Sequence, residues 1–314
     1  MRVVVVGCGY VGLALARQLH TRGHDVTGVR RSEGGLEAIQ AVGDEAAPAE
    51  RDRDVDGTPT GGVDAVRADA TEPDTLAALP DADAIVFAAS SGGRGATAAR
   101  EVYVDGLQNV IEEYGGRSTT PDRLVYTSST GVYGDHGGDW VDEETPIEPT
   151  TEKTAVLATA ERTALSATEH GIDGTVARFA GLYGPDRYRL RRYLDGPVTA
   201  GYLNMVHRDD AAGAIRHLLE TNQARDEAVV VVDDEPVDKH VFADWLADEC
   251  GVDRPPKRSK AERIAEGDLS EAARRRIHTS KRCSNARLRT LGYEFTYPTY
   301  RQGYRDAVAA FRRE

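Results

Sequence analysis

A glycine-rich turn that directly follows a short apolar run constrains the fold of this chain most strongly. The run RVVVV at residues 2–6 leads into the hexapeptide GCGYVG at 7–12. The run has the length of a buried strand, and the residues after the turn have helical period, with Val11, Leu15 and Leu19 on one face. Strand, glycine turn and helix in this order open a βαβ unit that binds a dinucleotide.

The three glycines of this turn have separate physical roles. Gly7 makes the tight turn, Gly9 lets the backbone approach a pyrophosphate, and Gly12 lets the helix pack on the strand. The helix N-terminus offers N–H groups and a positive dipole end to the anion. A plain strand-to-helix turn without a ligand is the alternative. The predicted phosphate site consists of Gly7, Cys8, Gly9, Tyr10, Val11 and Gly12.

The end of the second expected strand, HDVTGVRR at residues 24–31, bears on the choice between NAD and NADP. A carboxylate at this point would bind the ribose 2′-hydroxyl of NAD, whereas this chain has Arg30, Arg31 and Ser32. Because a guanidinium matches the geometry of a phosphate, the two arginines favour the 2′-phosphate of NADP over NAD. A solvated arginine pair is the alternative.

Strand and helix patterns alternate along the first half of the chain. This alternation predicts an α/β fold, a Rossmann-type doubly wound parallel sheet covered on both faces. We expect an NAD(P)-binding domain over 1–175 and a mixed portion over 176–314 that completes the sheet and forms a substrate lid. Residues 44–62 are acidic and rich in Pro and Gly, which predicts a solvated loop. Further strands are expected at 63–69, 82–90, 122–129, 174–181 and 227–234, and helices at 32–43, 96–115, 151–170, 208–220 and 299–313.

Charge and composition exclude several classes of protein. The formal net charge is −13, and the acidic residues are spread along the chain, so nucleic acid is a poor partner. A dispersed acidic surface with few lysines suits a salt-rich cytosol and predicts a halophilic source; an ordinary acidic protein from a GC-rich genome is the alternative. Apolar runs are too short to span a membrane. The three cysteines are far apart, without metal-ligand spacing, which favours a reducing cytoplasmic compartment and no metal site.

Six stretches together resemble the NAD-dependent epimerase/dehydratase family, the extended branch of the short-chain dehydrogenase/reductase superfamily. The resemblance runs over nearly the whole chain, and the stretches are specific as a set. They are RADATEPDTL, VFAAS, YTSSTGVYGD, RFAGLYGP, VHRDDAAGAI and RCSNARLRTLGYEFTYPTYRQGY. The resemblance implies nicotinamide-dependent chemistry on a polar hydroxyl or carbonyl substrate, which a nucleotide sugar exemplifies. It places Asp69 and Ala70 at the adenine, Ala88, Ala89 and Ser90 beneath the cofactor, and Phe179 and Ala180 near the nicotinamide.

Two departures from the family pattern affect the expected chemistry. The positions of the family's tyrosine and lysine hold Lys153 and Leu157, and none of the five lysines has a tyrosine four residues before it. The family's asparagine, three residues before Gly106, is Tyr103. Loss of a general acid/base typically costs ~10²- to 10⁴-fold in rate. An atypical subgroup of the superfamily resembles this chain in keeping the glycine turn while lacking the Tyr/Lys pair.

The remaining candidates for catalysis are Ser129, the family's third catalytic position, and Lys153. Ser129 can hydrogen-bond a substrate oxygen, although local turn bonding is an equal alternative. A desolvated Lys153 can act as a base, whereas a solvated lysine would not. Tyr133 and Tyr183 could donate a hydroxyl, but packing is the simpler expectation, and His207 is expected to orient a loop rather than to shuttle protons.

Two classes of function therefore remain open. One is an epimerase/dehydratase-like oxidoreductase with a non-standard active site, and the other is a non-catalytic NADP(H)-binding sensor or regulatory protein. A small-molecule substrate and a homodimer are the expected partners, without nucleic acid or membrane. The substrate lid is expected at residues 185–200 and 254–282, where Arg189, Arg191 or Arg192 would bind a substrate phosphate or lie on a solvated face.

Overall fold

The computed structural model describes residues 1–45, 62–92, 95–267 and 269–313. Most of the loop expected over 44–62 therefore lies outside the described residues. The chain forms two compact units, each assembled from several stretches. Unit 1 comprises Met1–Ser129, Glu152–Arg178 and Ala212–Val229, and unit 2 comprises Thr130–Thr151, Phe179–Ala211 and Val230–Glu314.

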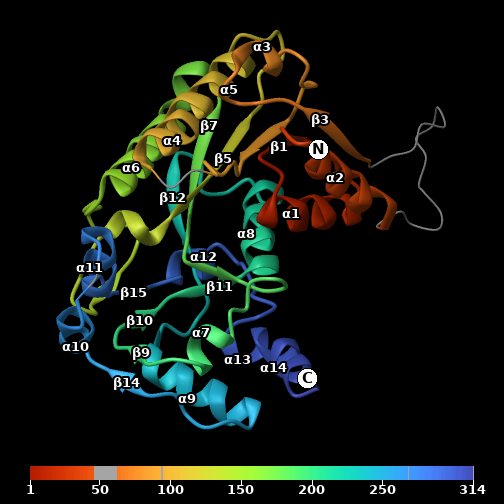
Figure 1. The fold of residues 1–314 in the computed structure, drawn as a ribbon. Coiled ribbons are helices and arrows are strands. Elements are labelled where there is room, and N and C mark those ends of the chain that lie inside the picture. Colours follow the sequence, from red (N-terminus) through yellow and green to blue (C-terminus); the bar gives the residue numbers. More distant parts are fainter. Residues whose placement is uncertain (46–61, 93–94, 268, 314) are drawn as a thin grey trace. The chain divides into compact units, whose positions relative to one another are not determined.

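The main sheet lies in unit 1, apart from the last residues of two strands, and confirms the predicted Rossmann fold (Figure 1). Its strand order is β12-β7-β5-β4-β1-β2-β3, and the pairings from β5 across to β3 are parallel. This order places the topological switch between β1 and β4, where a doubly wound sheet binds its ligand. The strands are β1 (Arg2–Val6), β2 (Asp25–Arg30), β3 (Val63–Arg67), β4 (Ala84–Phe87), β5 (Arg123–Ser129), β7 (Asp173–Phe179) and β12 (Glu227–Val231).

Helices cover both faces of this sheet because its strands are apolar on both sides. Val4 and Val6 belong to the buried cluster that holds Leu107 and Ile111, whereas Val5 faces Gly12 of α1. In Figure 1, α1 and α2 lie on one side and α4, α5 and α6 on the other. The helices of unit 1 are α1 (Tyr10–Thr21), α2 (Glu33–Glu45), α3 (Pro73–Leu76), α4 (Ala96–Arg100), α5 (Gly106–Gly115) and α6 (Glu152–Leu165).

Two of the long helices expected in unit 1 are not continuous α-helices. The helix expected over 96–115 contains a π-helical turn, η1 (Glu101–Asp105), between α4 and α5. The helix expected over 151–170 ends at Leu165 and continues as the 3₁₀ turn η3 (Ser166–His170). Periodicity alone identifies the helical stretch but does not register a single inserted residue.

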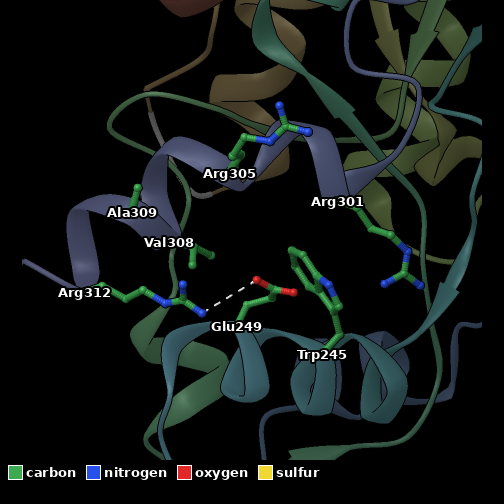
Figure 2. Close-up of a pocket in the computed structure, with 7 residues that line it drawn as sticks. All are labelled: Trp245, Glu249, Arg301, Arg305, Val308, Ala309 and Arg312. Atoms are coloured by element: carbon green, nitrogen blue, oxygen red, sulfur yellow. Dashed lines mark ion pairs between the residues drawn. The ribbon is translucent and has the colours of Figure 1, made fainter.

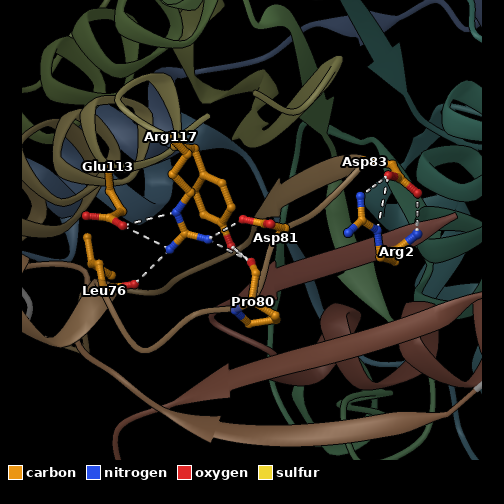
Figure 3. Close-up of polar contacts among 8 residues, drawn as sticks. Arg2, Leu76, Pro80, Asp81, Asp83, Glu113 and Arg117 are labelled. Carbon is orange, nitrogen blue, oxygen red and sulfur yellow. Dashed lines mark hydrogen bonds and ion pairs between the residues drawn. The ribbon is translucent and has the colours of Figure 1, made fainter. Parts of the chain in front are cut away.

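Polar contacts near the amino ends of the strands fix two connections of unit 1 (Figure 3). Asp83 accepts hydrogen bonds from the backbone N–H of Arg2 at 2.7 Å and from Arg2 Nη2 at 2.8 Å, which joins the starts of β1 and β4. Arg117, after α5, donates to Glu113 at 2.9 Å and to the carbonyl oxygens of Pro80 and Leu76 at 2.9 Å and 3.3 Å.

In its described part, unit 2 consists of short elements around an aromatic core. The core includes Phe242, Leu246, Tyr300 and Tyr304. Four two-stranded sheets contribute, β10-β13, β11-β8, β14-β9 and β15-β6. Their strands are β6 (Trp140–Val141), β8 (Gly181–Tyr183), β9 (Val198–Thr199), β10 (Tyr202–Leu203), β11 (Met205–His207), β13 (Val237–Asp238), β14 (Lys257–Arg258) and β15 (Arg282–Cys283).

Helical segments complete unit 2, and the expected helix over 299–313 is interrupted at Tyr304. The segments are η2 (Thr130–Tyr133), α7 (Arg191–Leu194), α9 (Lys239–Cys250), α10 (Lys260–Ala265), α11 (Glu271–His278), α12 (Ala286–Thr290), α13 (Tyr300–Gly303) and α14 (Arg305–Phe311). Helix α8 (Arg208–Glu220) begins in unit 2 and ends in unit 1.

Candidate cofactor site and its polar neighbours

The glycine turn has the backbone geometry that its sequence predicts. Gly7 has a φ of +80°, and a Cβ there would lie 2.2 Å from the Cα of Ala89, so only glycine fits. The N–H groups of Gly7 and Cys8 both donate to the carbonyl of Val29 at 3.1 Å. A Cβ on Gly12 would lie 3.2 Å from Val5 Cγ1, which shows how closely α1 packs on β1. The turn is therefore held between β1, β2 and the end of β4.

Arg30 extends over the glycine turn. A Cβ on Gly9 would lie 2.7 Å from Arg30 Nη1, and one on Gly35, in α2, would lie 2.8 Å from Arg30 Nε. Burial raises the pKa of the Cys8 thiol to about 12, and the nearby charge of Arg30 opposes that rise. Cys8 is thus a buried neutral thiol lining the turn. A guanidinium beside a helix N-terminus that has no side-chain cap suits an anionic group.

Arg31 is held by the residue that follows β3. Its Nη1 donates to Asp69 Oδ2 at 3.2 Å, and the Arg31 side chain is 58% exposed. Burial opposes ionisation of Asp69, but hydrogen bonds from the amide and hydroxyl of Thr71, together with Arg31, lower its pKa overall. Arg31, predicted for the ribose phosphate, and Asp69, predicted for the adenine, therefore lie side by side. Ser32, after Arg31, accepts hydrogen bonds at its carbonyl from the amides of Gly35 and Leu36 and starts α2.

The other cofactor residues predicted for unit 1 lie at strand ends. Ala88 and Ala89 follow β4 and line the turn at Gly7. Ala70 is buried, and its carbonyl accepts a hydrogen bond from Asn109 Nδ2 at 2.9 Å, which fixes it against α5. Tyr10 and Val11 form the first turn of α1. These residues gather at the carboxyl edge of the sheet, as expected for a doubly wound fold.

The end of β5 holds two serines with different surroundings. Ser128 is buried, and its Oγ donates to Glu161 Oε1 of α6 at 2.6 Å. Glu161 in turn accepts from Arg178 Nη2 of β7 at 2.8 Å. Ser129, the predicted catalytic serine, is the last residue of β5 and is partly buried. The Ser128 bond is long-range rather than the local turn bond that is common for such serines.

Tyr103 and Lys153 lie on two segments of unit 1, η1 and α6, that pack against each other. Tyr103 lies in η1, and its hydroxyl accepts a hydrogen bond from the amide of Ser91 at 3.3 Å. Lys153, in the first turn of α6, is partly buried, and its charge acts on the Tyr103 phenol. The sequence shows Tyr103 only as a departure from a family pattern. Tyr103 and Lys153 are far apart along the chain and form no sequence motif, so the tertiary structure is needed to find the pair.

The remaining predicted residues belong to unit 2. Phe179 and Ala180 are buried, and the amide of Ala180 donates to the carbonyl of Val231 at 3.2 Å. Tyr183 stacks on Tyr304 with ring centroids 4.9 Å apart. Burial lowers the pKa of His207 to about 4, and the charge of Asp209 opposes this, so the imidazole is neutral at pH 7. Tyr133 is also fully buried, as a packing tyrosine would be.

The two stretches expected to form a substrate lid are joined by a strand pair. β9 lies in 185–200 and β14 in 254–282, and they pair in parallel with Val198 opposite Lys257. Of the lid arginines, Arg191 lies 3.9 Å from Asp195 and stacks on Phe311 at 5.0 Å. The described part of unit 2 thus brings together two segments that are distant in the sequence.

A surface pocket of about 370 Å³ lies between α9 and the C-terminal helices of unit 2 (Figure 2). Arg301 there lies over Trp245 at 5.7 Å and pairs with Glu235 at 3.1 Å, and Arg312 pairs with Glu249 at 3.8 Å. Its lining is Trp245, Glu249, Arg301, Arg305, Val308, Ala309 and Arg312, so the residues predicted for the cofactor lie elsewhere. Of the helices in the described part of the chain, none has the length and apolar character needed to span a bilayer.

Comparisons with known proteins agree with this architecture. YeeZ of Escherichia coli (strain K12) is 28% identical over 301 residues, covering 95% of this chain and 96% of YeeZ. A structure from Methylobacillus flagellatus, described as an NAD-dependent epimerase/dehydratase, is 30% identical with a TM-score of 0.72, covering 100% of this chain and 99% of that one. The fold also matches DesIV, a dTDP-glucose 4,6-dehydratase from Streptomyces venezuelae with NAD and TYD bound. That match has 21% identity and a TM-score of 0.75, with 100% and 98% covered.

The profile of the family described as "NAD dependent epimerase/dehydratase" matches residues 3–234, which include the glycine turn, Ser129 and all of β12. The parallel sheet and its strand order are those of the nucleotide-binding fold that this family uses. The chain belongs to the NAD-dependent epimerase/dehydratase family.

Proposed function

We propose that unit 1 binds a nicotinamide dinucleotide at the glycine turn, with NADP preferred over NAD. The observation that carries this proposal is the position of Arg30, whose guanidinium extends over Gly9 at the N-terminus of α1. Arg31 adds a second, more exposed cation at the same strand end. Both guanidinium groups favour a 2′-phosphate, whereas Asp69, the nearby carboxylate, is paired with Arg31.

The proposed activity is that of an epimerase/dehydratase-like oxidoreductase acting on a hydroxyl or carbonyl group of a polar substrate, a nucleotide sugar being the leading class. Membership of the family supports this activity. The likeness to DesIV, a dTDP-glucose 4,6-dehydratase, supports the substrate class by fold alone. A bound nicotinamide would accept or return a hydride. Gly7, Gly9 and Gly12 would hold its pyrophosphate, and Ser129 would orient the substrate oxygen.

A non-catalytic NADP(H)-binding sensor is the second candidate. Two observations favour it. The sequence contains no Tyr-x-x-x-Lys pair, whereas the glycine turn is well formed. The two candidates differ in turnover, because a sensor binds the dinucleotide without exchanging hydride. We also propose a cytoplasmic protein of a salt-rich cell, given the net charge of −13, and a homodimer as its assembly.

Parallel fluorescence titrations with NADPH and NADH in molar KCl test the cofactor proposal. We expect tighter binding of NADPH, and we expect Arg30→Ala and Arg31→Ala to remove most of that preference. Loss of a charge-assisted hydrogen bond of about 1.5–3 kcal/mol corresponds to roughly 10- to 100-fold in affinity. Arg22→Ala, at the far end of α1, is the matched control. Equal affinity for both dinucleotides would contradict the NADP assignment, and binding of neither would contradict both candidate functions.

A further inference from the structure

A π-helical turn places Tyr103 at an unusual point of unit 1. η1 spans Glu101–Asp105 and interrupts an otherwise α-helical stretch. After it, Gly106 packs closely on Ala70, because a Cβ on Gly106 would lie 3.2 Å from the Ala70 Cβ, so the end of the turn is fixed. π turns are rare and occur frequently at functional sites, because the inserted residue redirects one side chain. Here the redirected segment carries a partly buried tyrosine.

The Tyr103 hydroxyl lies at the segment that follows β4. It accepts a hydrogen bond from the amide of Ser91 at 3.3 Å, and the hydroxyls of Ser90 and Ser91 also hydrogen-bond it. This segment begins with Ala88 and Ala89, which contact the glycine turn at Gly7. One short stretch of backbone therefore connects the dinucleotide turn to the phenol.

The positive charge of Lys153 acts on this phenol. α6, which begins at Glu152, packs against η1. Burial raises the pKa of Tyr103, but the hydrogen bonds from Ser91, the charge of Lys153 and the bond from Ser90 together lower it below its ordinary value of 10.0. Among the described residues, the buried Tyr126 of β5 is a second titratable group that interacts with this phenol. Glu101 and Asp105, on η1 itself, are exposed.

We propose that Tyr103 is the catalytic acid/base of this protein and that Lys153 is its positioning residue. The pair takes the place of a Tyr-x-x-x-Lys motif with residues from two separate helical segments. In the oxidising direction, the substrate O–H bond breaks and its proton passes to the Tyr103 phenolate oxygen. Oxidised nicotinamide, when bound, would supply the acceptor for the carbon-bound hydrogen and its electron pair, so that the C–O bond becomes C=O. This inference rests on the proposed function for its substrate and cofactor, but the phenol–ammonium pair can be tested without either.

Ultraviolet titration of phenolate absorbance tests the pair directly. We expect the difference between wild type and Tyr103→Phe to show one phenol that titrates below the ordinary pKa of about 10. Lys153→Met should move that titration upward, whereas Lys153→Arg, which keeps the charge, should restore it. Tyr114→Phe is the control, since burial raises the pKa of Tyr114 to about 12 and its loss should leave the low-pH titration unchanged. A Tyr103 phenol that titrates at 10 or above, or is insensitive to the charge at residue 153, would overturn the proposal.

Turnover assays with NADPH or NADP and a panel of dTDP-glucose, UDP-glucose and UDP-glucuronic acid provide the second test. We expect Tyr103→Phe to lower kcat by ~10²- to 10⁴-fold while dinucleotide affinity and the circular dichroism spectrum remain those of wild type. A Tyr103→Phe variant with the wild-type rate would refute the catalytic role. Failure of wild type to turn over a substrate while it binds the dinucleotide would count against the proposed oxidoreductase function, and the titration would then decide on the pair by itself.

Discussion

Glu161 of α6 and Arg178 of β7 form a buried ion pair, with Glu161 Oε2 2.8 Å from Arg178 Nη2. Their side chains are 4% and 8% exposed. Arg178 Nε lies 3.2 Å from both carboxylate oxygens, and Ser128 of β5 donates to Oε1 at 2.6 Å. The pair therefore fixes α6, the helix that carries Lys153, to two strands of the sheet.

We expect Glu161→Gln to destabilise the protein strongly. Removing one partner of a buried pair leaves the other charge uncompensated, which costs about 3–5 kcal/mol. Urea unfolding followed by circular dichroism measures this loss. The double variant Glu161→Leu/Arg178→Met removes both charges and should cost less than Glu161→Gln alone. If the double variant were the less stable of the two, the pair would be contributing a net attraction larger than its desolvation cost.

Gly9→Ala should separate folding from cofactor binding. The new Cβ would lie 2.7 Å from Nη1 of Arg30, the far end of a flexible side chain that can move aside. The fold should therefore survive, while dinucleotide affinity falls roughly 10- to 100-fold because the guanidinium and the close backbone approach are lost together. NADPH fluorescence titration with a parallel thermal melt checks both. Gly34→Ala is the matched control, since its Cβ would meet nothing within 4 Å. Unchanged affinity in Gly9→Ala would argue against the turn as the pyrophosphate site.

The contribution of Asp83 to stability should depend on pH. Burial opposes its ionisation, but the hydrogen bonds and charge of Arg2 lower its pKa below the ordinary value. A carboxyl with a lowered folded-state pKa stabilises the protein above its unfolded pKa of about 4, and this contribution disappears as the pH falls through the folded value.

Asp83→Asn should therefore cost about 1 kcal/mol at neutral pH, since the contact is half exposed, and nearly nothing in strong acid. Unfolding free energies measured from neutral pH into acid give the comparison. Arg2→Gln should show the same loss of pH dependence. A cost that stays constant down to the lowest pH would show that packing rather than charge carries the effect.

Tyr183→Phe is expected to leave stability unchanged or raise it by up to about 1 kcal/mol. Within the described residues, its buried hydroxyl has no hydrogen-bond partner, and removing an unsatisfied polar atom relieves a desolvation cost. Tyr304→Phe is the matched comparison, because the Tyr304 hydroxyl donates to the carbonyl of Tyr188 at 2.9 Å. That variant should lose about 0.5–1.5 kcal/mol. Thermal melts of both variants test the contrast, and a marked loss in Tyr183→Phe would mean that its hydroxyl is satisfied in solution.

Local patterns predicted the parts of the site whose residues are neighbours along the chain. The spacing of Gly7, Gly9 and Gly12 identified the turn, and the structure shows the close contacts that exclude larger residues there. Arg30 and Arg31 were found because they end a strand of predictable position. Such features can be predicted from the sequence because a turn, a helix start and a strand end are set by a few consecutive residues.

Contacts between distant stretches were beyond the reach of such patterns. The parallel pairing of Val198 with Lys257 joins two segments that the sequence offers only as a candidate lid. The π turn at η1 is equally hidden, because one inserted residue leaves helical periodicity almost unchanged. From the sequence alone, Tyr103 is seen only at the position of the family's asparagine and Lys153 only at the position of its tyrosine.

The sequence by itself determined the family, through its six matching stretches, and the parallel α/β sheet and the position of the glycine turn, through local periodicity and glycine spacing. Only the tertiary structure decided that the charge of Lys153 acts on Tyr103, that Arg31 pairs with Asp69, and that Glu161 is buried against Arg178. The physical reason is that packing of α6 and η1 on the sheet brings together residues far apart along the chain, and hydrogen bonds and charges act over a few ångströms of space rather than along the sequence.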